Sequence, residues 1–155
     1  MPKINTPYKF IVLHHTVTSK DATFQQVKEM HLAKGYHDVG YHYLFNATGN
    51  LIVGRPIAER GAHTVADKEP YLGHDMNTVG VGCSVIGDYT QYDLTQTQVN
   101  NISYNIKRIW DRHVKPNYPK NAKLTREIFI PHSAASFTAC PGTNTYEQVC
   151  AKLKI

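Results

Sequence analysis

Lys9–Phe10–Ile11–Val12–Leu13 is the stretch that decides the fold, and it runs directly into His14–His15. These residues are apolar and partly β-branched, which predicts a buried β-strand that ends at His14. Adjacent residues of a strand point to opposite faces of a sheet, so only one of His14 and His15 can easily face a cleft. Both faces of the run from Phe10 to Leu13 are apolar, so the hydrophobic alternation does not decide which histidine that is.

Apolar patterns elsewhere predict a mixture of strands and helices. Thr95-x-x-Gln98 is a capping box in front of a helical apolar pattern. The mixture predicts one α/β domain with a central, mixed, mostly buried β-sheet flanked by helices. The further elements that we expect are a helix from Phe24 to near Gly35, hairpin strands over 40–45 and 51–53, a strand over 79–86, a helix that follows Thr95 and includes Trp110, a strand over 127–130 that leads into Pro131–His132, and a closing helix over 143–153.

Length and composition exclude several classes of protein. The chain has 155 residues, of which 41% are hydrophobic and 19% charged, so it is neither disordered nor collagen-like. No stretch approaches the ~18 consecutive apolar residues of a membrane span. The N-terminal residues lack the apolar region of a secretory signal. Three cysteines are too few, and odd in number, for a disulfide framework.

The net charge of +5 comes from one segment of the chain. Residues 107–126, from Lys107 to Arg126, carry seven basic residues and one acidic residue. Such a segment predicts contact with an anionic partner such as a cell-wall or envelope polymer, although a solvated helix end and loop would have the same composition. No RNA-binding motif or zinc-finger spacing accompanies it, so we do not expect nucleic acid as the partner.

Three candidate metal ligands stand at the ends of predicted elements. His14 or His15 closes the first strand, His132 closes the last strand, and Cys140 follows eight residues later. Imidazole and thiolate are ligands that zinc prefers, and three protein ligands leave a fourth position for water, as in catalytic sites. Packing or surface histidines remain the alternative at this point, because a His-x7-Cys spacing alone is a weak signal.

Five short motifs, taken in order, resemble those of the type 2 N-acetylmuramoyl-L-alanine amidases, the family of phage amidase endolysins, bacterial amidases and peptidoglycan recognition proteins. Each motif is loose by itself, but together they span nearly the whole chain. The motifs are Ile11-Val12-Leu13-His14-His15-Thr16, Asp38-Val39-Gly40-Tyr41-His42-Tyr43, Gly61-Ala62-His63-Thr64, Asn77-Thr78-Val79-Gly80-Val81, and Pro131-His132 with Thr138-Ala139-Cys140-Pro141-Gly142.

The resemblance implies roles for individual residues. It assigns Zn²⁺ to His14, His132 and Cys140, and it places Tyr41 at the position of the catalytic tyrosine. Thr138 stands where many phage amidases have a catalytic lysine, so a weaker hydroxyl donor is expected there. It also implies that His63, Thr64 and Asn77 contribute to substrate binding, although loop-shaping is the alternative for Asn77. His15 is interpreted as a packing or supporting residue.

The resemblance also implies an activity and a setting. We expect residues 1–155 to form a single, monomeric zinc amidase domain without a separate wall-binding domain. Its substrate would be peptidoglycan, cut between the lactyl group of N-acetylmuramic acid and L-alanine. We expect a phage endolysin that waits in the host cytoplasm before it reaches the periplasm or wall. The alternatives are a non-catalytic peptidoglycan-binding domain and a cytoplasmic amidase that recycles muropeptides.

Overall fold

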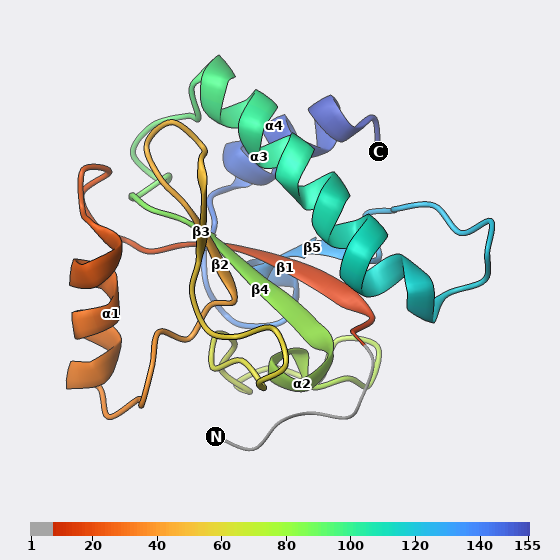
Figure 1. Ribbon diagram of the computed structural model, residues 1–155, viewed down its shortest axis with the longest axis horizontal. Helices are drawn as coiled ribbons and strands as arrows, with labels where there is room; N and C mark the ends of the chain where they lie inside the picture. The colour runs from red at the N-terminus through yellow and green to blue at the C-terminus, as the bar shows by residue number, and fades with distance from the viewer. Residues whose placement is uncertain (1–7) are drawn as a thin grey trace.

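The computed structural model describes residues 8–155, and these form a five-stranded sheet with helices on both faces (Figure 1). The strand order is β3-β2-β4-β1-β5, with β1, β2, β4 and β5 parallel and β3 antiparallel to β2. This is the predicted α/β domain with a mixed central sheet. In chain order the elements are β1 (Phe10–His15), α1 (Phe24–Ala33), β2 (Tyr43–Phe45), β3 (Leu51–Val53), α2 (Met76–Val79), β4 (Gly80–Val85), α3 (Gln96–Ile109), β5 (Phe129–Pro131) and α4 (Thr143–Leu153), with short helical turns at Trp110–Val114, Lys115–Asn117 and His132–Ala134.

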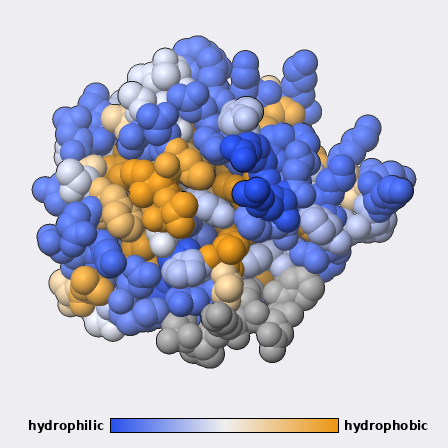
Figure 2. Space-filling view, in the orientation of Figure 1, coloured by the Kyte–Doolittle hydropathy of each residue, from blue (hydrophilic) through white to orange (hydrophobic). Residues whose placement is uncertain are grey.

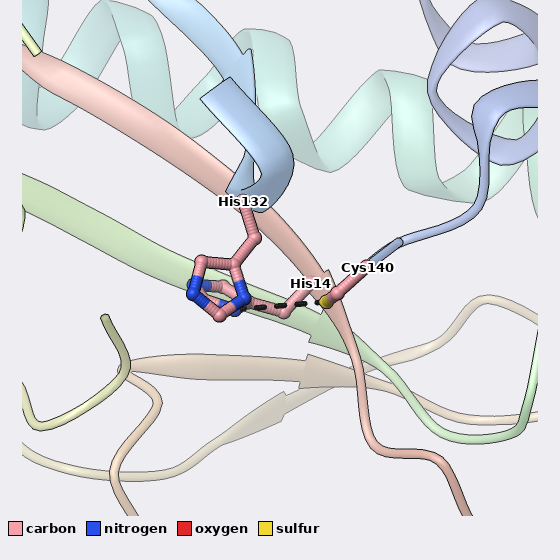
Figure 3. A group of neighbouring side chains, drawn as sticks. All are labelled: His14, His132 and Cys140. Atoms are coloured by element: carbon pink, nitrogen blue, oxygen red, sulfur yellow. Dashed lines mark hydrogen bonds between the residues drawn. The ribbon is translucent and has the colours of Figure 1, made fainter. Parts of the chain in front are cut away.

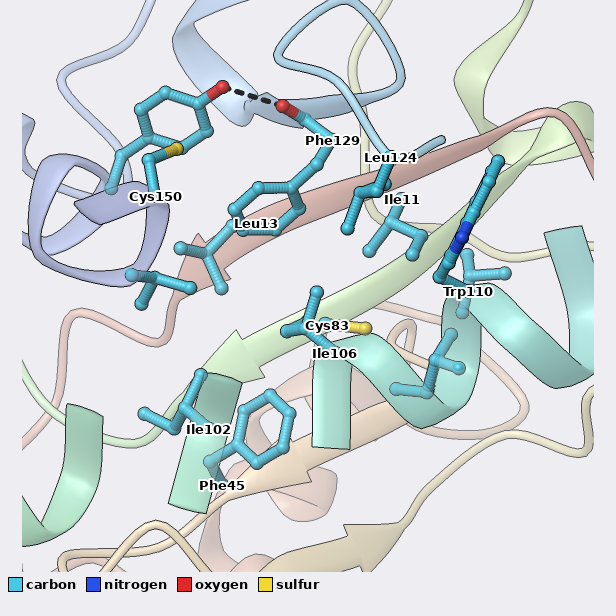
Figure 4. Packing of buried hydrophobic residues seen from close by; sticks show 14 of the residues in the cluster. Ile11, Leu13, Phe45, Cys83, Ile102, Ile106, Trp110, Leu124, Phe129 and Cys150 are labelled. Carbon is cyan, nitrogen blue, oxygen red and sulfur yellow. Dashed lines mark hydrogen bonds between the residues drawn. The ribbon is translucent and has the colours of Figure 1, made fainter. Parts of the chain in front are cut away.

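The two faces of β1 pack against different layers. Ile11 and Leu13 belong to the larger core, which α3 and α4 cover with residues such as Ile102, Ile106 and Val149 (Figure 4). Phe10 and Val12 face the other way and pack with α2 residues Met76 and Val79. Every residue of β1 is buried as a result. Because β1 is buried on both faces, the pattern of apolar residues does not indicate which face of the strand His14 or His15 occupies.

The strand boundaries differ from the sequence prediction in four strands. β1 ends at His15 rather than at His14. β2 begins at Tyr43 rather than at residue 40, because the Gly40 amide donates to His31 Nδ1 (2.7 Å) instead of to a neighbouring strand. β4 begins at Gly80, since Val79 ends the short helix α2. β5 covers Phe129–Pro131, slightly later than the predicted 127–130. The capping box predicted at Thr95 is present, with Thr95 accepting from the Gln98 amide.

The antiparallel edge of the sheet carries exposed apolar side chains. Leu51 and Val53 of β3 are exposed, and Figure 2 shows apolar residues gathered over the β2–β3 hairpin within a hydrophilic surround. Among residues 8–155, no helix combines the length and the hydropathy that crossing a membrane requires. The opposite, parallel part of the sheet brings the carboxyl ends of β1, β4 and β5 together.

Candidate metal centre

His14 is the histidine that faces the cleft. It lies on the face of β1 that carries Phe10 and Val12, whereas His15 continues the face of Ile11 and Leu13. His15 instead supports the neighbouring loops: its main-chain amide donates to Cys140 Sγ (3.2 Å), and its Nδ1 accepts from the Tyr89 amide (3.0 Å). The sequence had left this choice open, and the layers packed on the two sheet faces decide it.

The three predicted ligands come from separate chain segments and lie together (Figure 3). One ring nitrogen of His14, one of His132 and Cys140 Sγ all lie within 4.8 Å of one another. The rings of His14 and His132 are 4.3 Å apart between centroids, and His14 Nδ1 lies 3.9 Å from Cys140 Sγ. His14 is supplied by the end of β1, His132 by the turn after β5, and Cys140 by the loop that precedes α4.

A chain of hydrogen bonds sets the tautomer of His14. His63 Nε2 lies 3.1 Å from the Gly80 carbonyl oxygen, which can only accept, so this nitrogen carries the proton. Burial lowers the pKa of His63 to about 3, so its Nδ1 is an unprotonated acceptor at neutral pH. That atom is 2.9 Å from His14 Nε2, which therefore donates. The lone pair of His14 is left on Nδ1, the nitrogen that faces Cys140.

The cluster has the properties of a cation site. Both ring nitrogens of His132 are buried, and neither finds a hydrogen-bond partner among residues 8–155. An unpaired buried polar group is costly, and a bound cation would satisfy it. Burial lowers the pKa of His132 to about 4 and that of His14 well below its ordinary value, so both imidazoles are neutral and can offer lone pairs. Two imidazoles and one thiol are a donor set typical of zinc.

Cys140 is protonated while no cation is bound. Burial raises the pKa of its thiol to about 12, and the amide of His15 opposes that rise by donating to Sγ. Metal binding to a thiol of this kind displaces the proton, because the thiolate is the ligand. Cys83 and Cys150 are buried in the apolar core, away from this cluster.

Tyr41 borders the cluster from a segment outside the regular strands. Its ring lies 5.2 Å from the ring of His14 and 5.3 Å from that of His31, measured between centroids. Burial raises the pKa of Tyr41, so the hydroxyl is protonated at neutral pH and can donate a hydrogen bond. The main chain at Tyr41 is held by the Arg55 amide, which donates to its carbonyl (2.8 Å).

The predicted substrate-binding residues form one wall beside the cluster. Asn77 Oδ1 accepts from the amides of His63 (2.8 Å) and Thr64 (2.9 Å), and Asn77 Nδ2 donates to the Thr64 carbonyl (2.8 Å). Through these contacts Asn77 fixes the loop of residues 63 and 64, which is the alternative role that the sequence had kept open. His63, Thr64, Asn77 and Tyr41 all line a cavity of about 190 Å³, together with His31 and Lys34 of the α1 region.

Thr138 lies at the other side of the cluster. Its Oγ1 accepts from the Cys140 amide (3.1 Å), so the side chain shapes the start of the ligand loop. The Thr138 side chain is exposed and lines a different cavity from that of Tyr41. No hydrogen bond joins it to His14 or His132 within the described part of the chain.

Sequence reasoning missed two contributions of histidine. His63 was predicted only as part of the groove wall, but it also contacts His14 directly. His31 is buried and accepts from the Gly40 amide, which fixes the segment that leads to Tyr41. No local signal marks either contact, because the partners lie 49 and nine residues apart in different elements.

Comparisons with known proteins agree with this arrangement. The sequence profile described as N-acetylmuramoyl-L-alanine amidase matches residues 4–143. Peptidoglycan-recognition protein SC2 of Drosophila simulans is 26% identical over 148 residues, which cover 90% of this chain and 71% of that protein. Peptidoglycan-recognition protein SC1a of Drosophila melanogaster is 26% identical over 149 residues, with the same shares of the two chains covered, 90% and 71%.

Solved structures share the fold. N-acetylmuramoyl-L-alanine amidase LysC from Clostridium intestinale URNW superposes with a TM-score of 0.78 at 25% identity, covering 100% of this chain and 91% of that one. Peptidoglycan recognition protein-LE, solved in complex with tracheal cytotoxin, a monomeric diaminopimelic acid-type peptidoglycan, gives a TM-score of 0.73 at 23% identity. It covers 97% of this chain and 83% of that one, and at this identity the likeness concerns the fold alone.

Proposed function

The chain belongs to the N-acetylmuramoyl-L-alanine amidase family, and from this premise we propose that it is a catalytically active, zinc-dependent member. Its reaction would be hydrolysis of the amide bond between the lactyl group of N-acetylmuramic acid and the L-alanine of the stem peptide. The observation that carries the proposal is the cluster of His14, His132 and Cys140, in which the buried ring nitrogens of His132 have no hydrogen-bond partner among the described residues. The structural likeness to the LysC amidase supports it.

The residues of this chain would divide the work as follows. His14 through Nδ1, His132 through a ring nitrogen and Cys140 through Sγ would hold the metal. When bound, zinc supplies Lewis acidity and lowers the pKa of a bound water to about 7. His63 would keep His14 in the tautomer that presents Nδ1. The buried sheet end and the loops around it would restrict bulk water at the reacting carbonyl.

Tyr41 is the candidate for stabilising charge on the reacting carbonyl oxygen. Its hydroxyl stays protonated at neutral pH because burial raises its pKa, so it can donate to an oxyanion. Removing one such donor typically lowers the rate ~10²–10³-fold. Thr138 can place a second hydroxyl on the opposite side of the cluster, although its Oγ1 already accepts from the Cys140 amide. The leaving amine would take its proton from Tyr41 or from water.

We also propose a biological role and a secondary contact. The likeness to an endolysin amidase of Clostridium intestinale supports a phage endolysin that acts as a monomer and is held in the host cytoplasm until lysis. Within residues 8–155, Lys107 pairs with Asp111 and Arg126 with Glu147, but the other five basic residues of the segment 107–126 have no ion pair. The segment lies on the α3 side of the sheet, away from His14. It could thus contact an anionic envelope polymer while the cleft holds substrate.

Digestion of purified peptidoglycan sacculi tests the proposed reaction. The wild-type protein with zinc should release stem peptides that begin with free L-alanine, identified by mass spectrometry, and leave the glycan strands intact. Cys140→Ala should abolish release and zinc binding, whereas Cys150→Ala, a matched change outside the cluster, should retain both. Full activity in Cys140→Ala would exclude the zinc mechanism. Sacculus binding without release by the zinc-loaded wild type would favour the non-catalytic peptidoglycan-binding domain.

A further inference from the structure

The free edge of the sheet at β3 has main-chain groups that are open to another strand. β3 ends the strand order, so within the described part of the chain only β2 pairs with it. The Gly54 amide donates to the His42 carbonyl (2.9 Å), which makes residues 42 and 54 a hydrogen-bonded pair. Such pairs alternate along an antiparallel ladder, and the next pair along is Val53 with Tyr43. The amides and carbonyls of Val53 and of Leu51, two residues earlier, therefore point away from β2.

The side chains of the same two residues are apolar and exposed. Leu51 is 38% exposed and Val53 is 64% exposed. Both line a groove of about 170 Å³ whose opposite wall is the end of α3 and the turn after it, and we call it the β3–α3 groove. Figure 2 shows the apolar surface over the hairpin. An exposed apolar edge strand is a template for pairing with another chain.

Two arginines form the charged wall of the β3–α3 groove. Arg108 lies at the end of α3 and Arg112 in the following turn, and both are exposed. Neither forms an ion pair within residues 8–155, and no aspartate or glutamate lines the groove. Lys115 and Lys123 of the same basic segment line a different cavity, near Trp110. The groove thus combines free main-chain groups, apolar side chains and unpaired positive charge.

We propose that the β3–α3 groove binds an acidic, partly apolar segment of another protein in an extended conformation. The segment would add a strand at the free edge, with main-chain hydrogen bonds to Leu51 and Val53 and alternate apolar side chains in the groove. Its carboxylates would pair with Arg108 and Arg112. This inference does not depend on the amidase function.

The charge of the β3–α3 groove favours this occupant over two others. Edge-to-edge pairing with a second copy of the chain would bring two sets of Arg108 and Arg112 together, and like charges at an interface are unfavourable. A polymer that offers only anionic groups would leave the apolar walls and the free amides without partners. An acidic peptide strand satisfies all three features.

The β3–α3 groove and the candidate metal centre lie on opposite faces of the sheet. Tyr43, which also lines the groove, packs against the larger core under α3. His14 lies on the face of β1 that carries Phe10 and Val12. A partner in the groove therefore leaves the cleft open to substrate.

Three fluorescein-labelled peptides test the chemistry of the occupant. Glu-Thr-Val-Thr-Val-Thr-Glu places two valines and two glutamates on one face of a strand. One comparison peptide has lysines for the glutamates, and the other has proline for the central threonine, which removes a ladder amide. The first peptide should bind about tenfold more tightly than either comparison, by fluorescence anisotropy. It should also shift the NMR signals of residues 51–53 and 105–113. No binding by the first peptide, or equal binding by the lysine peptide, would overturn the proposal.

Variants of the protein separate charge from edge pairing. Arg108→Gln with Arg112→Gln should weaken binding of the acidic peptide about tenfold, since two exposed charge pairs are lost. Lys20→Gln with Lys152→Gln is the matched control and should change nothing. Val53→Ala keeps the outward amide and Val53→Pro removes it, so the proline variant should bind more weakly. With circular dichroism showing each variant folded, unchanged affinity in the arginine variant, or equal affinity of the two Val53 variants, would refute the model.

Sedimentation distinguishes the other occupants. Without peptide, the wild type should sediment as a monomer. Any binding to phosphatidylglycerol vesicles should persist when Arg108 and Arg112 are both replaced by glutamine. A dimer that Val53→Pro disrupts would assign the groove to a second copy of the chain. Vesicle binding that the arginine variant abolishes would assign it to a membrane, and either result would overturn the proposal.

Discussion

Replacing His63 by alanine should weaken zinc binding without removing any metal ligand. In the wild type, His63 Nδ1 accepts a hydrogen bond from His14 Nε2 (2.9 Å), and His63 Nε2 donates one to the Gly80 carbonyl (3.1 Å). The His63 ring packs against Gly61 and Gly82. A Cβ atom on either glycine would lie 2.5 Å from the Cδ2 atom of the ring. The His63 ring is therefore held in place, and His14 is oriented through it.

The magnitude follows from the role of such supporting groups. Loss of a hydrogen-bond partner to a metal-bound histidine typically lowers metal affinity ~10–100-fold, which corresponds to about 1.4–2.8 kcal/mol. Because His14 is 1% exposed, its Nε2–H would also be left buried without an acceptor. That cost, roughly 1–3 kcal/mol, should lower the free energy of unfolding of the metal-free protein. His63→Gln, whose amide oxygen can accept the same proton, should have an intermediate affinity.

Competition with a chromophoric chelator measures the zinc affinity directly and does not depend on activity. Circular dichroism at the same temperature establishes that each variant is folded. His37→Ala is the matched control, because His37 is exposed and lies apart from the cluster. Wild-type affinity in a folded His63→Ala protein, beside a large loss in His14→Ala, would refute the proposed orientation of His14 by His63.

Three further predictions concern stability and surface charge. Burial lowers the pKa of His42 to about 4 from 6.5, so the unfolded chain binds the proton more tightly. The metal-free protein should therefore lose up to about 3 kcal/mol from this group as the pH falls from 6.5 towards 4, and urea unfolding at constant stability across that range would contradict it. Arg55→Met removes a buried guanidinium that donates to the carbonyls of Val39 (3.0 Å) and Arg60 (2.8 Å), and should cost about 2–3 kcal/mol in urea unfolding. Arg60→Met, at a more exposed position, should cost about 1 kcal/mol or less, and equal costs would argue against the role of Arg55. Replacing Lys115, Lys120 and Lys123 by glutamine should flatten the salt dependence of sacculus lysis, whereas the same change at Lys20, Lys28 and Lys152 should not; an unchanged slope would make the segment a solvated face.

Much of the fold could be predicted because its signals are local. The apolar run before His14 and the capping box at Thr95 depend on neighbouring residues, and the predicted strand and helix are both present, with the strand one residue longer at its end. Strand boundaries were less predictable. β2 starts late because the Gly40 amide binds His31 of α1, a contact that no pattern within residues 40–45 encodes.

The candidate site divides in the same way. Its residue types could be read from the motifs, and His14, His132 and Cys140 do lie together. The loop-clamping role of Asn77 was one of two interpretations, and its amide has both ends bound to the main chain of residues 63 and 64. The contact between His63 and His14 was not foreseen, because it depends on where two distant segments pack.

Short patterns of residues in a fixed order were enough to establish the class of fold, the family and the identity of the candidate ligands. The packed layers were needed to show that His14, and not His15, faces the cleft. Both faces of β1 are buried, so its sequence of apolar residues does not distinguish one face from the other. The same packing selected Nδ1 of His14 through the contact with His63. Each of these features depends on which distant segments are brought into contact, and that is a property of the assembled layers.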